Sequence, residues 1–127
     1  MHIKLKIVSA ALGAVLASPL AMAQVSGNVI RIGLITDMTG GFADPDGAGG
    51  IDAIRLAIAD AEGTVDGKKT ELLTFDHQNK ADNASSKARE WFDQQGVDVL
   101  IGGTNSAASL AMAKIAAERE LSWHNEY

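Results

Sequence analysis

From residue 29 onward, the chain alternates between short apolar runs and longer segments with apolar residues at helical spacing. Three runs predict strands, at residues 29–35, 71–75 and 97–101, and the first is typical of a strand buried on both faces. The order is strand, helix, strand, helix, strand, helix. Short connections between these elements predict parallel pairing with right-handed crossovers, and therefore a layered α/β sheet.

The three predicted helices cover residues 51–61, 82–95 and 106–117. In the first, Ile51, Ile54 and Ile58 fall on one face, which predicts packing against the sheet. Gly63 and Gly96 follow the first two helices at the position where a glycine usually ends a helix.

Two further segments predict irregular structure. The glycine-rich stretch at residues 40–50 predicts a loop, and Asp66 followed by Gly67 predicts a tight turn before the second strand.

The N-terminus has the features of a cleaved signal peptide. Lys4 and Lys6 precede an uncharged apolar stretch at residues 7–16, and Ala21-Met22-Ala23 has the small-x-small pattern of a cleavage site. The apolar stretch is shorter than the ~20 residues that a membrane-spanning helix needs. An amphipathic or buried N-terminal helix is the alternative, but no polar face recurs at helical spacing. We therefore expect a signal peptide at residues 1–23, cleavage after Ala23, and a mature chain of residues 24–127.

Composition narrows the possible functions. A chain of 127 residues accommodates one domain, and a formal charge of −5 makes nucleic acid a poor partner. The absence of cysteine excludes thiol catalysis and thiolate-bound metals. No nucleophile, paired acid and base, or phosphate-binding loop is found, so we expect no enzyme activity and no cofactor.

Ligands of open α/β sheets bind beyond the carboxyl ends of the strands. Three segments lie there, at residues 36–50, 76–81 and 102–106. In the third, two glycines allow close approach, and the Ser106 hydroxyl with the N–H groups of Ser106 and Ala107 could hold a carboxylate. The alternative is that Ser106 is only an N-cap, which stabilises its helix by ~1 kcal/mol.

Other candidate sites at this edge have structural interpretations. The spacing of Asp37, Asp44, Asp46 and Asp52 does not match a calcium loop, so we interpret them as a solvated acidic loop. His77 is not accompanied by a serine elbow and is interpreted as a turn histidine. The glycines at residues 47–50 match neither G-x-G-x-x-G nor a P-loop.

A family resemblance is carried by residues 32–40, residues 53–60, Asp76 with the alanine-rich helix after it, and residues 99–106. Over nearly all of residues 29–120, the chain resembles the periplasmic leucine/isoleucine/valine-binding proteins and the wider family of type I solute receptors. The resemblance implies the N-terminal part of a parallel-sheet, three-layer lobe from a two-lobed periplasmic protein. Such a protein closes on an amino acid or related organic acid and delivers it to an ABC permease in the membrane.

The resemblance also implies site residues. In the family, the serine at the start of the third helix holds the ligand carboxylate, and the loop after the first strand borders the ligand. The expected ligand-binding residues are therefore Ser106, Ala107, Thr104, Asn105, Gly40, Gly41 and Phe42, with no metal.

The sequence departs from the family pattern in three places. Gly40-Gly41 stands where a Gly-Pro is common, and residues 47–50 are similar to a branch suspected of binding aromatic acids. Residues 121–127 are polar where the family has another apolar strand, so we expect a truncation or shifted frame. Such a chain would have an exposed sheet edge, marginal stability and weak or no ligand binding. The alternatives are a sensory ectodomain, an exported enzyme on a flavodoxin-like sheet, and a non-functional gene fragment.

Overall fold

The computed structural model describes residues 27–119 and 122–125, so the expected signal peptide and its cleavage site lie outside the described residues. A five-stranded sheet has the strand order β2-β3-β1-β4-β5. The strands are β1 (Val29–Thr36), β2 (Thr64–Val65), β3 (Lys68–Asp76), β4 (Val99–Gly102) and β5 (Ser122–Asn125). The helices are α1 (Ala43–Asp46), α2 (Ala48–Asp60), α3 (Ala81–Glu90), the π-helix η1 (Trp91–Gln95) and α4 (Ser106–Glu118).

The sheet is parallel except at one edge. β1 lies in the centre and pairs in parallel with β3 and with β4, and Ile32 is opposite both Leu72 and Val99. β2 and β3 form an antiparallel hairpin, and both turn residues, Asp66 and Gly67, have positive φ angles of 53° and 76°. The predicted parallel α/β sheet and the predicted tight turn are therefore confirmed.

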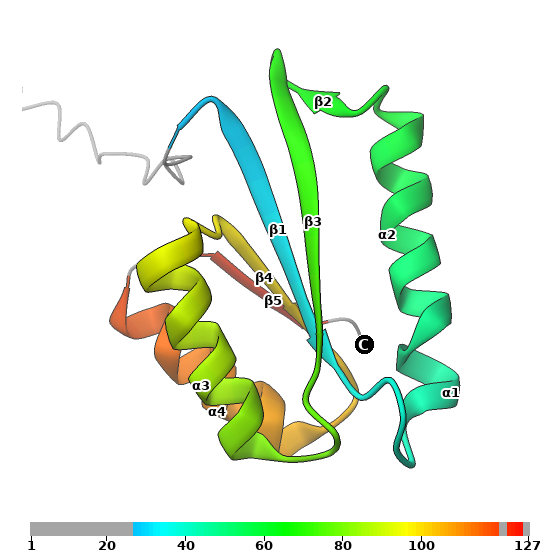
Figure 1. Cartoon of the computed structure of the whole chain (residues 1–127), viewed down its shortest axis with the longest axis vertical. Helices are drawn as coiled ribbons and strands as arrows, with labels where there is room; N and C mark the ends of the chain where they lie inside the picture. The colour runs from blue at the N-terminus through cyan, green and yellow to red at the C-terminus, as the bar shows by residue number, and fades with distance from the viewer. Residues whose placement is uncertain (1–26, 120–121, 126–127) are drawn as a thin grey trace, which may run out of the picture.

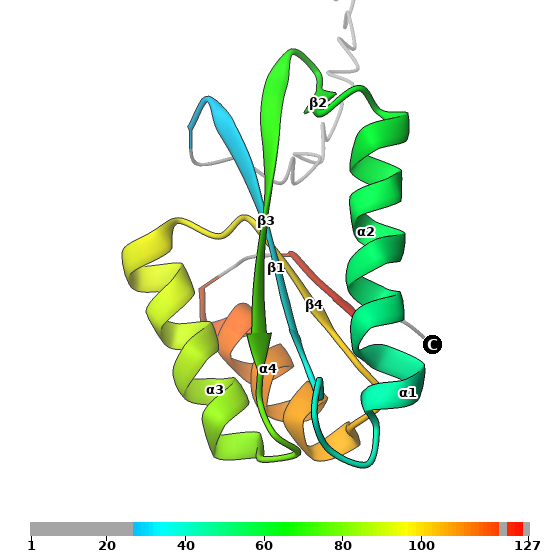
Figure 2. The same cartoon turned by 45° about the vertical axis from the view of Figure 1, so that its right-hand side comes forward.

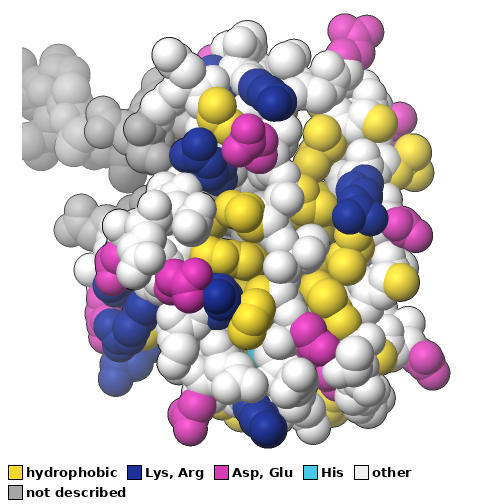
Figure 3. Space-filling model, in the orientation of Figure 1, with side chains coloured by type: hydrophobic (Ala, Val, Ile, Leu, Met, Phe, Trp, Pro, Cys, Tyr) yellow, Lys and Arg dark blue, Asp and Glu magenta, His cyan; other side chains and the backbone are white. Residues whose placement is uncertain are grey.

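Helices cover both faces of the sheet, which gives three layers (Figures 1 and 2). α2 lies along one face, and α3 and α4 lie side by side on the other. Figure 3 shows hydrophobic side chains on both sides of β3, towards α2 on one side and towards α3 on the other. None of the helices in the described part of the chain is long and apolar enough to cross a membrane.

The main core lies between the sheet and the pair α3–α4. Trp91 is at its centre, 5% exposed, with its ring edge-on to Phe75 at a centroid distance of 6.5 Å. A Cβ atom on Gly33 would lie 2.6 Å from Cε3 of Trp91, so β1 passes directly beneath the indole ring. The other buried members of this core are Ile35, Ala84, Ala88, Val97, Leu100, Ala108, Met112 and Ile115.

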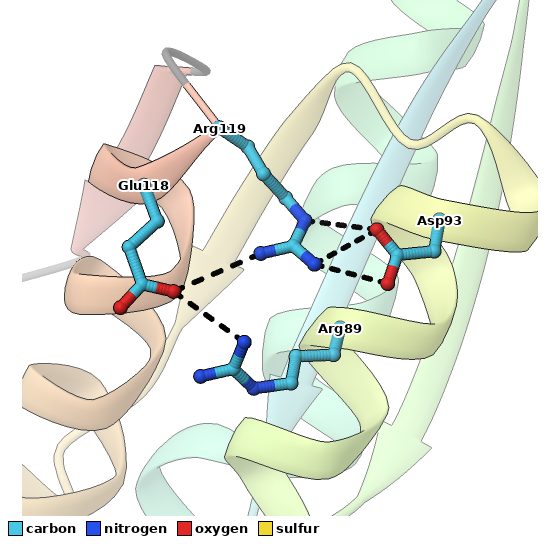
Figure 4. A network of polar contacts seen from close by, with 4 residues as sticks. All are labelled: Arg89, Asp93, Glu118 and Arg119. Atoms are coloured by element: carbon cyan, nitrogen blue, oxygen red, sulfur yellow. Dashed lines mark hydrogen bonds and ion pairs between the residues drawn. The ribbon is translucent and has the colours of Figure 1, made fainter.

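An ion-pair network fastens η1 to the end of α4 (Figure 4). The Arg119 guanidinium donates to both oxygens of Asp93, with its Nη2 atom 2.8 Å from Oδ1 and 2.9 Å from Oδ2. Glu118 lies 3.4 Å from Arg89 and 3.9 Å from Arg119. Because the Asp93 side chain is 55% exposed, water and salt screen the pair, and it stabilises the fold by no more than ~1 kcal/mol.

Two predictions of local structure are wrong. Residues 40–50 are not one loop, because they contain α1 and the first turn of α2, and the Gly47 N–H donates to the Ala43 carbonyl at 2.8 Å. The predicted strand at residues 97–101 begins two residues later. The carboxylate of Asp98 turns back to accept the Arg31 N–H at 2.9 Å, and parallel pairing with β1 starts at Val99.

The segment after residue 120 also differs from the expectation. The sequence predicts that the sheet edge beyond the third strand is exposed. Instead, β5 pairs in parallel with β4, with Leu100 opposite Trp123. Backbone pairing does not require apolar side chains, so a polar segment can extend the sheet.

Candidate ligand-binding site

Three loops meet at the carboxyl edge of the sheet, at the bottom of Figures 1 and 2. They follow β1 (residues 37–42), β3 (residues 77–80) and β4 (residues 103–105). This is the edge at which open α/β sheets bind ligands.

The first loop is built around the carboxylate of Asp37. This side chain is fully buried, and it accepts the N–H groups of Gly40 at 2.9 Å and Phe42 at 3.0 Å. A Cβ atom on Gly40 would collide with the same carboxylate, so the loop requires glycine there. The interpretation of Asp37 as part of a solvated acidic loop is therefore wrong, because this carboxylate organises the backbone.

Asp76, the last residue of β3, joins the first loop to the second. Its carboxylate accepts the Met38 N–H at 3.0 Å, the Thr39 hydroxyl at 2.6 Å and the Gln78 N–H at 2.8 Å. Burial acts to raise the pKa of this carboxyl, but the three hydrogen bonds and nearby His77 outweigh it and hold the pKa below the usual value. The group is therefore a fixed negative acceptor at neutral pH.

His77 is a buried turn residue, as the sequence predicts. It is 1% exposed, and its Nδ1 atom accepts the Asn79 N–H at 3.0 Å. Burial lowers the pKa of His77, although the negative charges of Asp37 and Asp76 oppose the shift. The imidazole is therefore neutral at pH 7, with Nδ1 as its acceptor.

The third loop leads into α4 through Asn105. The Asn105 carboxamide oxygen accepts the Ala108 N–H at 2.9 Å, which makes Asn105 the N-cap, and its Nδ2 group donates to Asn79 in the second loop. The alternative interpretation of Ser106 as the N-cap is wrong, because Ser106 is the first residue of the helix. Ser106 and Ala107 are exposed, and first-turn N–H groups have no acceptor within a helix.

Thr104 connects the third loop to α1. The Asp46 Oδ2 atom accepts the Thr104 N–H at 2.5 Å and the Thr104 hydroxyl at 2.6 Å. Gly103 has no room for a side chain, because a Cβ atom there would collide with Asp46 and with the buried hydroxyl of Thr36. Asp46, like Asp37, is thus a structural acceptor for backbone N–H groups.

The predicted site residues occupy two of the three loops. Gly40, Gly41 and Phe42 are exposed in the first loop, and Phe42 has 37% of its surface accessible. The other four, Thr104, Asn105, Ser106 and Ala107, surround the start of α4. Among the described residues, no hydrogen bond joins Ser106 or Ala107 to residues 40–42.

Sequence reasoning missed the side chains that hold the loops together. Asp76 immediately follows the predicted strand at residues 71–75, and Asn79 lies in the segment after it. These positions at the carboxyl end of a strand were the available signal. Across residues 27–119 and 122–125, no cluster of three or more His, Asp or Glu side chains is arranged to hold a metal ion.

Comparison with known proteins identifies the family. The sequence model of a family described as "Periplasmic binding protein" matches residues 29–123, most of the chain. The chain belongs to the periplasmic binding proteins. The solved structures that it resembles are type I members of this family, and they are binding proteins, not enzymes.

Three crystal structures illustrate the similarity. A periplasmic binding protein from Burkholderia mallei is 54% identical, with a TM-score of 0.75, over 77% of this chain and 26% of that one. A branched-chain amino acid ABC transporter ligand-binding protein from Burkholderia xenovorans is 37% identical, with a TM-score of 0.69, over 74% and 25%. A Rhodopseudomonas palustris solute-binding protein in complex with 3,4-dihydroxybenzoic acid is 32% identical, with a TM-score of 0.69, over 78% and 27%.

This chain therefore spans about a quarter of the length of these solved relatives. None of the curated proteins matches the chain.

Proposed function

We propose that this chain is part of the N-terminal lobe of a solute-binding protein that serves an ABC importer. Its ligand is a branched-chain amino acid or a related small organic acid, held between this lobe and a second one. The partner is the ABC permease in the membrane, and no cofactor takes part.

The start of α4 is the observation that carries this proposal. Ser106 and Ala107 expose two first-turn N–H groups and one hydroxyl at the carboxyl edge of the sheet. The Asn105 carboxamide already satisfies the Ala108 N–H, so the two free N–H groups belong to adjacent residues. Such a group of donors at a helix N-terminus favours a carboxylate.

The relatives support a ligand with a carboxylate group, either an aromatic acid or an amino acid. One relative at 32% identity was crystallised with 3,4-dihydroxybenzoic acid, and another at 37% is described as the periplasmic ligand-binding protein of a branched-chain amino acid ABC transporter. Both ligand classes carry a carboxylate next to an apolar body. Phe42, exposed in the first loop, supplies an apolar surface for that body.

The periplasm is the proposed location, with residues 1–23 removed as a signal peptide. Family membership supports the compartment, and the residue pattern supports cleavage after Ala23. Mass spectrometry of the exported protein should show Gln24 as the first residue, and an intact Met1 would contradict this part of the proposal.

The binding test compares the exported chain with a chimera that provides a second lobe. In the chimera, residues 29–119 replace the corresponding segment of the Burkholderia mallei relative, which is 54% identical. Calorimetry with leucine, isoleucine, benzoate and 3,4-dihydroxybenzoate should detect binding, stronger in the chimera than in the chain alone. The proposal is refuted if none of these carboxylates binds to either protein.

The role of Ser106 is tested by replacing it with alanine. A lost hydrogen bond to a charged carboxylate weakens binding by about 10- to 150-fold. Ser86→Ala is the matched control, because Ser86 is an exposed serine on α3 and lies outside the three loops. Equal affinities for Ser106→Ala and the original protein would reject the carboxylate contact.

A further inference from the structure

The carboxylate of Asp46, at the end of α1, contacts the loop that leads into the proposed ligand site. It reaches from α1 to Thr104, where one oxygen accepts both the backbone N–H at 2.5 Å and the side-chain hydroxyl at 2.6 Å. Thr104 lies two residues before Ser106, so the Asp46 carboxylate is bound to the loop that leads directly into the α4 N-terminus.

This contact decides how many donors remain for a ligand. The Thr104 N–H is taken by Asp46, and the Ala108 N–H is taken by the Asn105 side chain. The Asn105 amide group is itself bound to Asn79. The N–H groups of Ser106 and Ala107 and one hydroxyl are left, which match the acceptors of one carboxylate but not two.

The position of Asp46 is fixed by packing as well as by hydrogen bonds. The Asp46 carboxylate lies against Gly103, and so does the Thr36 hydroxyl, which is fully buried and has no partner among the described residues. Any larger residue at position 103 would push the carboxylate away from Thr104. The charge therefore cannot move aside to make room for a second anionic group without breaking two short hydrogen bonds.

We propose that Asp46 sets the charge specificity of the ligand site, by positioning Thr104 and by repelling any second carboxylate on the ligand. Ligands with one carboxylate are accepted, and otherwise identical ligands with two are rejected by at least about tenfold. This inference rests on the proposed function and narrows its ligand class to monocarboxylates, including zwitterionic amino acids.

Asp46→Asn is the informative variant, because asparagine has nearly the same shape and its amide oxygen can still accept from Thr104. It removes the charge and keeps the loop. Asp44→Asn is the matched control. Asp44 lies in the same short helix, is exposed, and makes no hydrogen bond or ion pair within residues 27–119 and 122–125.

The experiment measures dissociation constants by calorimetry for two pairs of ligands. It uses whichever protein binds ligand, the chain or the chimera. The first pair is 3,4-dihydroxybenzoate and 4,5-dihydroxyphthalate, which differ by one carboxylate next to the first. The second pair is glutamine and glutamate, in which a neutral carboxamide is replaced by a second carboxylate. The readout is the ratio of the two dissociation constants within each pair. A general loss of structure would weaken the binding of both ligands and leave this ratio unchanged.

The expected result is a ratio of tenfold or more in the original protein, reduced at least fivefold by Asp46→Asn and unchanged by Asp44→Asn. Raising the salt concentration should also reduce the ratio in the original protein, and this measurement needs no variant. The inference is overturned if the ratio of dissociation constants in Asp46→Asn equals that of the original protein, or if both variants change it equally. The proposed function is decided separately, by the affinity of Ser106→Ala. If no carboxylate binds at all, the proposed function fails, and the inference fails with it.

Discussion

Replacing Gly33 by alanine will destabilise the fold, because β1 has no space for a methyl group at this position. Gly33 is in the central strand, directly under the indole ring of Trp91. An added Cβ atom would lie 2.6 Å from Cε3 and 2.7 Å from Cζ3 of that ring, and 3.3 Å from the Val97 side chain. Ordinary contacts of this kind begin at 3.4 Å, so the ring or the strand must move.

The magnitude follows from how little freedom Trp91 has. The ring is 5% exposed, and Phe75 blocks it edge-on at a centroid distance of 6.5 Å. Relieving the collision therefore requires an unfavourable rotamer or a backbone shift in β1. Overpacking of this type costs ~1–3 kcal/mol of unfolding free energy.

Urea unfolding followed by circular dichroism measures the effect, with Gly50→Ala as the matched control. Gly50 lies in the first turn of α2, and a methyl group added there would meet no atom within 4 Å, so alanine should stabilise by up to ~1 kcal/mol. In a Trp91→Leu background the collision is removed, and Gly33→Ala should cost much less. The reasoning is refuted if Gly33→Ala is as stable as the original protein, or if its cost is the same in both backgrounds.

Two further predictions concern the loops of the candidate site. Burial holds the pKa of His77 in the folded protein below its ordinary value of 6.5. At a pH between the folded and the ordinary pKa, the unfolded chain therefore binds more protons than the folded one, and stability should fall as the pH drops below 6.5. Urea midpoints between pH 5 and pH 8 should show this slope, and His77→Asn should flatten it; an unchanged slope would contradict the assignment. Asn105→Ala should cost ~1 kcal/mol because the Ala108 N–H loses its cap, whereas Asn105→Ser keeps a cap oxygen and should recover most of the loss in thermal unfolding. Equal losses in the two variants would show that capping is not the role of Asn105.

The layered sheet could be predicted because its signal is repeated along the chain. The apolar run that became β1 is buried in its second half, at Leu34 and Ile35, and Ile54 is the buried member of the stripe on the first helix. The glycine-rich stretch was misjudged, because glycine lowers helix propensity while tertiary contacts decide the outcome. There, Asp46 anchors α1 to Thr104, a contact between residues 58 positions apart that no local pattern reveals.

The end of the second helix shows a different limit. Helical periodicity correctly extends to Gln95, and Gly96 ends the element with a φ of 62°. The last turn, however, is a π-helix, and a five-residue turn cannot be distinguished from an α-helical one by apolar spacing. At the site, Asn105 and Ser106 are both good capping residues, and only the backbone geometry shows that Asn105 is the cap.

The central position of β1 has a consequence for the order in which the chain can fold. Arg31 in β1 pairs with Glu71, 40 residues away, and with Asp98, 67 residues away. β1, the first strand to be synthesised, can therefore pair on both sides only after β3 and β4 have been made, and the main core is complete only after α4 has followed them. High contact order slows folding, so the chain should fold more slowly than a helical protein of the same length.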